Sequence, residues 1–409
     1  MQTAPLRKTA RIALSLVLLA TTQRAMADMG SMKMTGGSCA GPELTCARSA
    51  TPLLLPDGTL WLAWAAGGHV SVARSVDLGH HFSPAVVLNA EEATMDSGPD
   101  ARPKIVEDKA GRLIVAWSIL KDKNWNAQVL IAQSTDGGQS FTPPRPVGND
   151  AASQRFEALE ALPSGELFVA WLDKRDATAA MRKGQNYLGA ALAYAWSANG
   201  GATMTQTRIG HDNTCECCRL GVAMTPSGRP VVLFRNIYNG DVRDHAVTTF
   251  NADGTPGRIY RVSVDNYQID GCPHHGPSLA ISAAGTYHAA WFTNGSVRQG
   301  LFYARSTDGG RSFSQPMALS SPERHPARPY VLATEGAVWL TWKEFDGNQA
   351  IVRLRQSRDD GITWSEPKTI ARTTGDSDQP LLVSDGHRAF LSWMTHDEGY
   401  QLILLGGAS

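Results

Sequence analysis

The chain has 409 residues, of which 42% are hydrophobic and 19% charged, and it contains 39 glycines, 22 prolines and 11 tryptophans. A chain of this length and composition can bury a large core, which excludes an intrinsically disordered protein and a coiled coil. Basic and acidic residues balance at 38 each, so the chain lacks the positive excess that general nucleic-acid binding requires.

The first 27 residues have the pattern of a secretory signal peptide. A basic start with Arg7, Lys8 and Arg11 precedes an apolar run over residues 12–20 and a small-x-small site at residues 25–27. The apolar run is too short to cross a membrane, and no later run reaches the roughly twenty apolar residues of a transmembrane helix. We therefore expect an exported chain, periplasmic or secreted and without membrane insertion, whose mature form has 34 basic and 38 acidic residues.

One turn motif recurs along the rest of the chain. Four copies share the form S-x-D-x-G-x-x-F/W, at residues 75–82, 134–141, 306–313 and 357–364. A worn copy lies at residues 197–201 and a fainter one at residues 253–254, which gives spacings of 51 to 63 residues. Serine and aspartate can cap the backbone of a tight turn, glycine supplies a positive φ, and the aromatic residue anchors the turn. The motif therefore predicts a repeated structural turn.

Short apolar segments with a tryptophan or phenylalanine alternate with these turns. They cover residues 60–64, 113–117, 167–171, 231–234, 287–291, 338–342 and 389–393. Each follows another apolar run that a glycine turn closes, so a four-stranded unit of about fifty residues repeats. Repeats of this length are typical of propeller blades. We predict an all-β chain that forms a single β-propeller of four-stranded antiparallel blades, with seven blades favoured and six as the alternative.

The repeats also define the domains. We expect a signal peptide at residues 1–27, a segment containing methionines and cysteines at residues 28–50, and the propeller at residues 51–409. The last unit ends with its third strand at residues 401–405. A segment near residues 36–48 could supply the fourth strand, which would close the ring and leave no open sheet edge.

The four clear copies of S-x-D-x-G-x-x-F/W on successive repeats resemble the Asp-box propellers of the sialidase (neuraminidase) superfamily. The repeats extend over nearly the whole mature chain. The resemblance implies a ligand site at the mouth of the central channel, with an anionic glycan or another small anion as the partner. Similar boxes occur in propellers that only bind or scaffold, so the motif leaves open whether the chain is an exo-sialidase-type hydrolase.

A sialidase needs a tyrosine nucleophile, a glutamate that activates it and an aspartic acid that donates a proton. No motif in this sequence fixes the three residues. Asp100, Glu157 and Tyr330 are the candidates, with Asp96, Glu160 and Tyr238 as alternatives of similar chemistry. Each of these side chains could equally serve the fold.

Arginines occupy one repeated position, just before the predicted inner strands. They are Arg102, Arg155, Arg219 and Arg328. Inner strands line the channel, so we expect these guanidinium groups to meet at one mouth and to bind a carboxylate or phosphate bidentately. Sialidases use an arginine triad on the sugar carboxylate, and Arg102 and Arg328, each followed by proline, are similar to the family's arginine, although the aromatic-Arg-Ile-Pro order is absent. Alternatively, each arginine pairs with a neighbouring acid such as Asp100, Glu157 or Asp378.

Two adjacent repeats carry the densest set of metal-binding residue types. Residues 215–219 (C-E-C-C-R) align with residues 272–276 (C-P-H-H-G), which predicts one cluster of Cys215, Cys217, Cys218, Cys272, His274 and His275. Thiolates and imidazoles suit a soft metal such as copper or zinc, and Met29, Met32 and Met34 add thioethers that favour Cu(I). Because Cys217 and Cys218 are adjacent, we expect the ligands to be Cys215 or Cys217, Cys272 and one histidine.

Disulfides are the alternative for the six cysteines of an exported chain. Two would join Cys215, Cys217, Cys218 and Cys272, and a third would join Cys39 to Cys46. Two function classes therefore stay open. One is a propeller that binds, or binds and hydrolyses, an anionic glycan, and the other is a periplasmic metal-binding protein without glycosidase activity.

Overall fold

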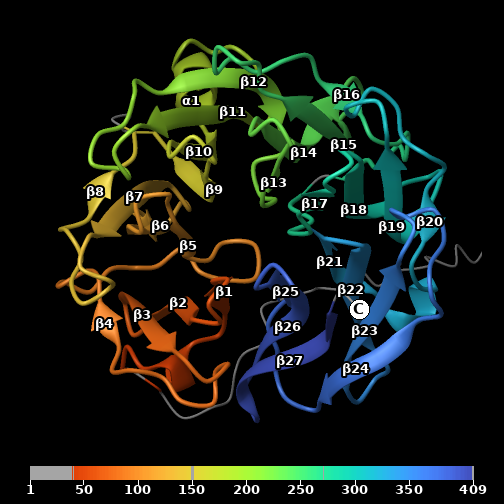
Figure 1. Cartoon of the computed structure of the whole chain (residues 1–409). Helices are drawn as coiled ribbons and strands as arrows, with labels where there is room; N and C mark the ends of the chain where they lie inside the picture. Colours follow the sequence, from red (N-terminus) through yellow and green to blue (C-terminus); the bar gives the residue numbers. More distant parts are fainter. Residues whose placement is uncertain (1–38, 40, 149–151, 270, 408–409) are drawn as a thin grey trace, which may run out of the picture. The chain divides into compact units, whose positions relative to one another are not determined.

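Nearly all regular structure in the chain is β-strand, and successive strands pair with each other (Figure 1). The computed structural model describes residues 39, 41–148, 152–269 and 271–407, so the expected signal peptide and the three methionines lie outside the described residues. Residues Ala40–Ser409 form a unit of their own. Within the described ranges, no helix has the length and apolar character needed to cross a membrane.

The strands group into sheets in chain order, and every pairing is antiparallel. The first sheet contains β1 (Ala50–Leu54), β2 (Leu60–Ala66), β3 (His69–Ser75) and β4 (Val86–Val87). The second contains β5 (Lys104–Glu107), β6 (Leu113–Leu120), β7 (Ala127–Ser134) and β8 (Arg145–Pro146). An eight-stranded sheet follows, with β9 (Gln154–Ala161), β10 (Leu167–Asp173), β11 (Ala190–Ser197), β12 (Arg208–Thr214), β13 (Gly221–Met224), β14 (Pro230–Tyr238), β15 (Val242–Thr249) and β16 (Tyr260–Arg261).

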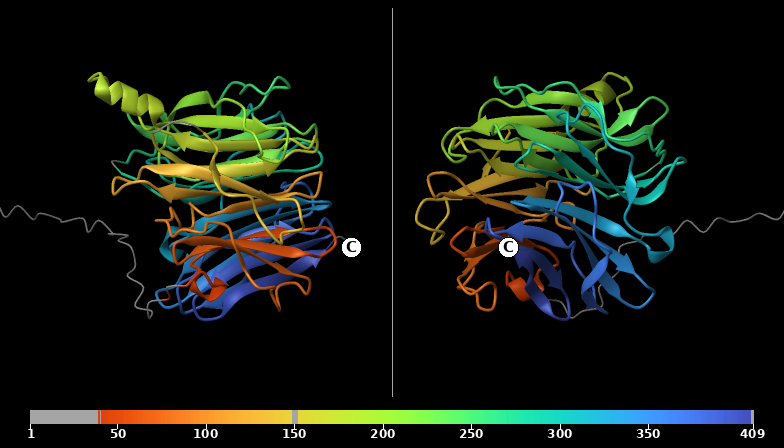
Figure 2. Two further views of the ribbon diagram at one scale, coloured as in Figure 1. Left: turned by 90° about the vertical axis from the view of Figure 1, so that its left-hand side faces the viewer. Right: turned by 45° about the vertical axis from the view of Figure 1, so that its right-hand side comes forward.

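Three further sheets complete the order. They contain β17 (Ser278–Ile281), β18 (Tyr287–Asn294), β19 (Gln299–Ser306) and β20 (Met317–Ala318); β21 (Ala327–Thr334), β22 (Ala337–Phe345), β23 (Ala350–Ser357) and β24 (Lys368–Thr373); and β25 (Leu381–Ser384), β26 (Arg388–Thr395) and β27 (Gly399–Gly407). The helical segments in the described ranges are η1 (Leu44–Cys46), α1 (Arg175–Arg182) and η2 (Pro322–Arg324). Side views show α1 projecting from the sheets (Figure 2).

The sheets stand around a central axis, and the first strand of each four-stranded group lies nearest to it (Figure 1). This arrangement confirms the predicted all-β propeller of four-stranded antiparallel sheets. In the eight-stranded sheet, β9–β12 and β13–β16 are two such groups, joined through the pairing of Thr214 with Asn236. Because this pairing merges two groups, the sheets do not fix the number of blades, and the count of seven stays a prediction.

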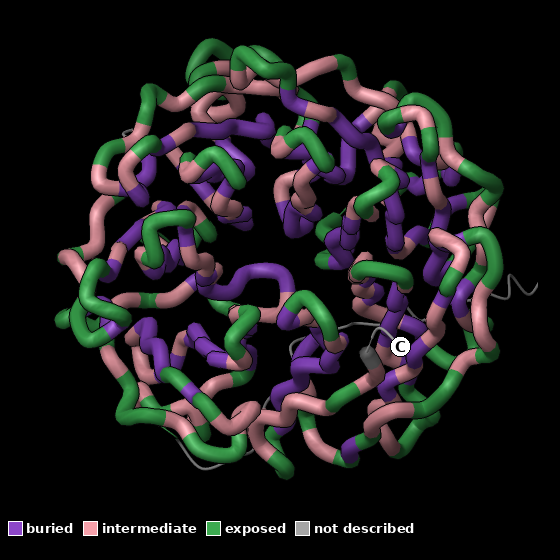
Figure 3. Tube along the Cα trace, in the orientation of Figure 1, coloured by how far each residue is buried: buried purple, intermediate pink, exposed green. Residues whose placement is uncertain are grey.

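The core lies between neighbouring sheets: Trp61 of the first sheet, for example, packs in one cluster with Val115 of the second, and most of the backbone of the inner strands is buried (Figure 3). All seven apolar segments expected from the sequence are second strands of their groups. Their aromatic residues are among the largest fully buried side chains: Trp64, Trp117, Trp171, Phe234, Trp291, Trp342 and Trp393. Burial on both faces explains why these strands are apolar almost throughout instead of alternating.

The repeated turn motif has the structural role that the sequence predicts. In the second copy, Ser134 Oγ donates to Asp136 Oδ1 at 2.7 Å and accepts from the N–H of Gly138 at 2.9 Å. Asp136 Oδ1 also accepts the N–H of Ser140 at 3.0 Å. The serine makes the same pair of bonds in the copies that begin at residues 75, 197, 306 and 357. The motif thus fixes the turn between the third and fourth strands.

The ends of the ring meet without the expected fourth strand. Within the described part of residues 36–48, no residue joins β27; residues 44–46 form η1, and the Pro42 carbonyl accepts the indole N–H of Trp64 at 2.8 Å in the first sheet. That part of the closing prediction is wrong, because this segment is held by the first sheet. Side chains join the ends instead. Phe390 packs into the core of the first sheet, and the Phe82 and Tyr400 rings meet edge to face at 5.8 Å.

A buried ion pair ties the same joint. Arg102, just before β5, donates to both carboxylate oxygens of Asp378 at 2.8 and 2.6 Å. Asp378 precedes β25 and also accepts the N–H of Ala50 in β1 at 3.3 Å. Both side chains of the pair are nearly inaccessible, at 3% and 2% exposed. One carboxylate therefore connects the first, second and last sheets.

Replacing a glycine of the turn motif tests how the turns pack. Gly138→Ala should lower the free energy of unfolding by about 3 kcal/mol, because its φ is +81° and the new Cβ would lie 2.2 Å from the buried Trp61 ring. Gly137→Ala is the matched control, since its φ is +71° and a Cβ there meets nothing within 4 Å. It should cost only about 1 kcal/mol. Urea unfolding measures both, and equal losses would contradict this packing.

Removing the charge of Asp378 tests the joint. Asp378→Asn should lower the free energy of unfolding by roughly 3 to 5 kcal/mol, because it leaves the buried Arg102 without a counter-ion. Asp397→Asn is the control, since Asp397 is 46% exposed in its pair with His396 and should cost less than about 1 kcal/mol. A loss at Asp378 no larger than at Asp397 would show that packing alone closes the ring.

Candidate functional site

All four arginines predicted to bind ligand lie at or just before the start of an inner strand, and each pairs with a carboxylate. Besides the Arg102 pair, Arg155 in β9 donates to both oxygens of Asp96, at 2.6 and 2.8 Å. Arg219, between β12 and β13, and Arg328, in β21, share Asp100. The alternative of arginines paired with acids is therefore seen at every position, with Asp96 as a partner in place of Glu157.

The Asp100 group is the part of this mouth that keeps a positive charge. Burial acts to raise the pKa of Asp100, but the guanidinium groups of Arg328 and Arg219 outweigh it and hold this pKa at about 2. Two cations thus share a single anion. Arg328 lies 2.9 Å from Asp100, donates to the His274 carbonyl at 2.7 Å and is 18% exposed. One guanidinium charge is left over, on a side chain that solvent can reach.

The contacts of Arg155 differ from those of the arginines that share Asp100. Its guanidinium lies over the rings of Trp125 and Phe156, at 5.5 and 4.6 Å from their centroids. Phe156 has a left-handed φ of 57° and coincides with a bulge in the pairing of β9 with β10. An ion pair and two aromatic rings thus fix Arg155, so little of its guanidinium group is available to a ligand.

The predicted catalytic candidates differ in which of them can carry a proton. Asp100 is ionised at neutral pH and cannot be the acid. Glu157 is buried and accepts a hydrogen bond from Ser118; burial raises its pKa to about 7 although the charge of Lys104 opposes this. Burial also raises the pKa of Glu160 to about 7. Both glutamates can therefore hold a proton near neutral pH.

Tyr330 does not have the character of an activated nucleophile. Burial raises its pKa, and the nearby negative charge of Glu160 raises it further, whereas Arg219 and Arg102 act in the opposite direction. An activated phenol needs a lowered pKa. Lys104, the first residue of β5, interacts with both glutamates and was missed by sequence reasoning, although a lysine in an apolar inner strand is a recognisable signal.

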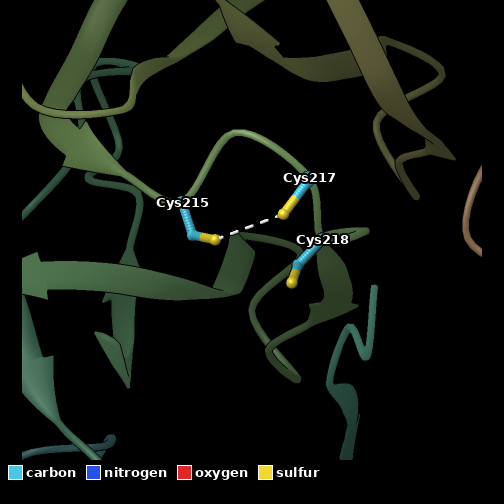
Figure 4. Close-up of side chains that lie close together, drawn as sticks. All are labelled: Cys215, Cys217 and Cys218. Atoms are coloured by element: carbon cyan, nitrogen blue, oxygen red, sulfur yellow. Dashed lines mark hydrogen bonds between the residues drawn. The ribbon is translucent and has the colours of Figure 1, made fainter. Parts of the chain in front are cut away.

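The predicted metal cluster is only partly assembled. The Sγ atoms of Cys215, Cys217 and Cys218 all lie within 4.8 Å of one another, in the loop between β12 and β13 (Figure 4). All three are buried, and the sulfurs of Cys215 and Cys217 are 3.6 Å apart. Although Cys217 and Cys218 are adjacent in the chain, the sulfurs of both lie within 4.8 Å of the Cys215 sulfur, so their side chains do not diverge as the sequence suggested.

The other predicted ligands lie around this group. Cys272 is exposed, and the neighbouring Cys217 lowers the pKa of its thiol. His275 is buried with its ring stacked on Phe292 at 4.2 Å, and within the described ranges its Nδ1 has no hydrogen-bond partner. His274 is exposed. The sulfur group is thus the centre of the cluster, and the histidines are outside it.

The cysteines divide into two kinds. Cys39 and Cys46 are disulfide-bonded. Cys215, Cys217, Cys218 and Cys272 are free. The disulfides expected as the alternative between the two repeats are therefore absent among these four residues, which leaves four thiols available as ligands.

A polar hollow of about 520 Å³ lies beside the cysteine loop, lined by Asn213, Asn236, Tyr238, Asn239, Arg261 and Asn266 among others. The Asn236 side-chain oxygen and the Tyr238 hydroxyl are buried and have no hydrogen-bond partner in the described part of the chain. Arg261 lies over the Tyr238 ring at 4.5 Å. Sequence reasoning missed this hollow, because its residues come from β12, β14, β16 and two loops with no shared motif.

The raised pKa of Glu160 predicts a pH-dependent stability. Its pKa is about 7 in the folded chain and near 4.5 in the unfolded chain, so the folded state binds the proton more tightly. The stability that this provides is complete below pH 4.5 and is lost as the pH rises to 7. Glu160→Gln should therefore become more stable relative to the wild type across this range, by at most about 1.4 kcal/mol per pH unit. Urea unfolding at several pH values measures this, and a constant difference would contradict it.

Comparison with known proteins shows a likeness in structure and none in sequence. No protein-family model and no curated protein sequence matches the chain. The Hadza microbial sialidase Hz136 is 14% identical, with a TM-score of 0.52 over 85% of this chain and 76% of its own. An ulvan lyase bound to GlcA(1-4)Rha3S is 12% identical, with a TM-score of 0.56 over 88% of this chain and 95% of its own. The polysaccharide lyase Uly1 is 7% identical, with a TM-score of 0.53 over 90% of each chain. These likenesses concern the fold: the chain shares its β-propeller architecture with a sialidase and with polysaccharide lyases.

Proposed function

We propose that this chain is an exported, seven-bladed propeller that binds an anionic carbohydrate at the mouth of its central channel. The observation that carries the proposal is the sharing of Asp100 by Arg219 and Arg328, which leaves one guanidinium charge uncompensated. A carboxylate or sulfate group of a sugar would complete the charge balance. Guanidinium suits such groups because its planar fork donates two parallel hydrogen bonds.

Arg328 is the residue that would contact the sugar. It is more exposed than Arg102, Arg155 and Arg219, and its position is fixed by Asp100 and by the His274 carbonyl. A fixed guanidinium loses little side-chain entropy when it binds. Arg102 and Arg155 would act indirectly, by holding the inner strands that carry the mouth.

The fold gives the proposal a second support. A sialidase and an ulvan lyase whose structure contains GlcA(1-4)Rha3S share this architecture, and the sugars that define them are acidic. The proposal is for binding without hydrolysis. Asp100 is tied up as an ion, and Tyr330 has a raised pKa, so neither has the properties that the glycosidase set requires.

Calorimetry with the mature chain tests this function. N-acetylneuraminic acid, glucuronic acid and the GlcA(1-4)Rha3S disaccharide are the probes, and at least one should bind. Arg328→Ala should weaken binding by about 10- to 100-fold, which corresponds to the loss of a charge-assisted contact. Arg388→Ala is the matched control, because Arg388 is 43% exposed in its pair with Asp385 and lies outside the mouth.

Two outcomes would overturn the proposal. One is the absence of binding by every acidic sugar. The other is a loss of binding in Tyr238→Ala without a loss in Arg328→Ala, which would place the ligand in the asparagine-lined hollow. Arg328→Lys guards against misfolding as an explanation, since it keeps the charge while removing the two-pronged contact.

A further inference from the structure

The cysteine loop lies beside a buried cation that pairs with no carboxylate in the described part of the chain. Arg235, in β14, is 1% exposed. Its guanidinium donates only to backbone carbonyls, those of Arg243, His275 and Phe292, at 2.8, 3.2 and 2.9 Å. In the described ranges no acidic side chain pairs with it. Because an isolated buried charge is costly, this arginine calls for a negative partner nearby.

The cysteine sulfurs are the groups that can supply this negative charge. Cys215, Cys217 and Cys218 are all buried, and the Cys215 N–H donates to the carbonyl of Arg235 itself. A second arginine, Arg243, approaches the Cys215 Sγ to 3.8 Å while it also pairs with the exposed Asp241 at 3.1 Å. Glu216, the acidic residue within the loop, pairs with Lys174 at 2.7 Å. The sulfurs therefore lie beside two arginines whose charge a thiolate would offset, and the thiolate is the form that binds metals.

The spacing of the sulfurs fits a single ion. Three thiolates about 2.3 Å from one ion, arranged in a plane, lie about 4 Å from one another. The sulfurs of Cys215 and Cys217 are 3.6 Å apart, and all three sulfurs lie within 4.8 Å of one another. The backbone holds this geometry, because the Cys215 N–H donates to the Arg235 carbonyl at 2.8 Å. Little rearrangement is needed for all three to bind.

We propose that Cys215, Cys217 and Cys218 bind one Cu(I) ion as thiolates, and that the exposed Cys272 is the surface thiol through which the ion enters. Soft thiolates select Cu(I), which is satisfied by three of them, whereas structural Zn²⁺ takes four ligands. Binding displaces a proton from each thiol that carries one and transfers no electron. Cys272 lies close enough to Cys217 for the two thiols to influence each other's pKa, so the ion can pass between their sulfurs by ligand exchange.

This site uses no residue of the proposed sugar contact, so the two proposals stand or fall separately. It also revises the ligand set expected from sequence. Cys217 and Cys218 both bind, and His274 and His275 do not. The unpartnered Nδ1 of His275 makes it the main competing ligand, so its variant belongs in the test.

Anaerobic titration of the reduced, mature chain with Cu(I), in competition with bicinchoninate, tests the site. One Cu(I) should bind per chain. Cys215→Ser and Cys218→Ser should each weaken the affinity by about 100-fold or more, the scale expected when a metal ligand is lost. Cys272→Ser should keep the affinity and slow the transfer of Cu(I) from the chelator by about 10-fold. His275→Ala is the control and should change neither.

X-ray absorption on the wild type keeps the test independent of variants that fail to fold. The copper should show three sulfur neighbours and no nitrogen. A chain that binds no Cu(I), a shell that includes nitrogen, or equal affinity in Cys215→Ser and the wild type would each overturn the proposal. So would stoichiometric Zn²⁺ that Cu(I) cannot displace, or disulfides among Cys215, Cys217 and Cys218 in the chain as isolated.

Discussion

The closed arrangement of sheets depends on the buried pair of Arg102 and Asp378. Among the described residues, no strand pairing links the first sheet to the last. The Asp378 carboxylate instead accepts the N–H of Ala50 and both terminal nitrogens of Arg102, which connects three sheets. Packing of Phe390 and Tyr400 against the first sheet covers this joint. Because the pair is removed from water, salt screens it much less than it screens a surface pair.

The same chemistry limits what the channel mouth can bind. An arginine whose fork is filled by a buried carboxylate cannot hold a ligand without breaking that pair, so Arg102 and Arg155 act as ties between segments. The Asp100 group is the exception, because two arginines, Arg219 and Arg328, share this one carboxylate. In the structure, carboxylates therefore neutralise most of the arginines that the sequence predicted at the mouth, and one guanidinium charge is left without a partner.

The cysteine loop shows a different balance. Arg235 is held by three carbonyls and by the ring of Tyr267, whose centroid lies 5.1 Å from its guanidinium. Nothing acidic neutralises it in the described chain, and the three sulfurs lie in the neighbouring loop between β12 and β13. A metal site at this position would rest on rigid strands, β12 and β14, while its entrance at Cys272 belongs to the loop before β17. With the ligands held by strands and the entrance exposed, an ion could bind at the sulfurs while its path from the surface stays open.

The sequence by itself determined the repeating unit. The spacing of the Asp boxes and of strands with a tryptophan predicted four-stranded sheets, since both signals are local: the turn bonds join residues at most four positions apart, and burial on both faces leaves an apolar strand. The tertiary structure alone decided which charges pair, which of six candidate ligands meet, and how the ring closes. These depend on side chains from repeats that are far apart in the chain, such as Arg219 and Asp100, which are 119 positions apart. A repeat alignment gives equivalent positions on different sheets, but the distance between two such positions depends on the ring and on the loop conformation. For that reason the alignment predicted one cluster of six residues, whereas the structure brings together the sulfurs of Cys215, Cys217 and Cys218 and leaves His274 and His275 outside.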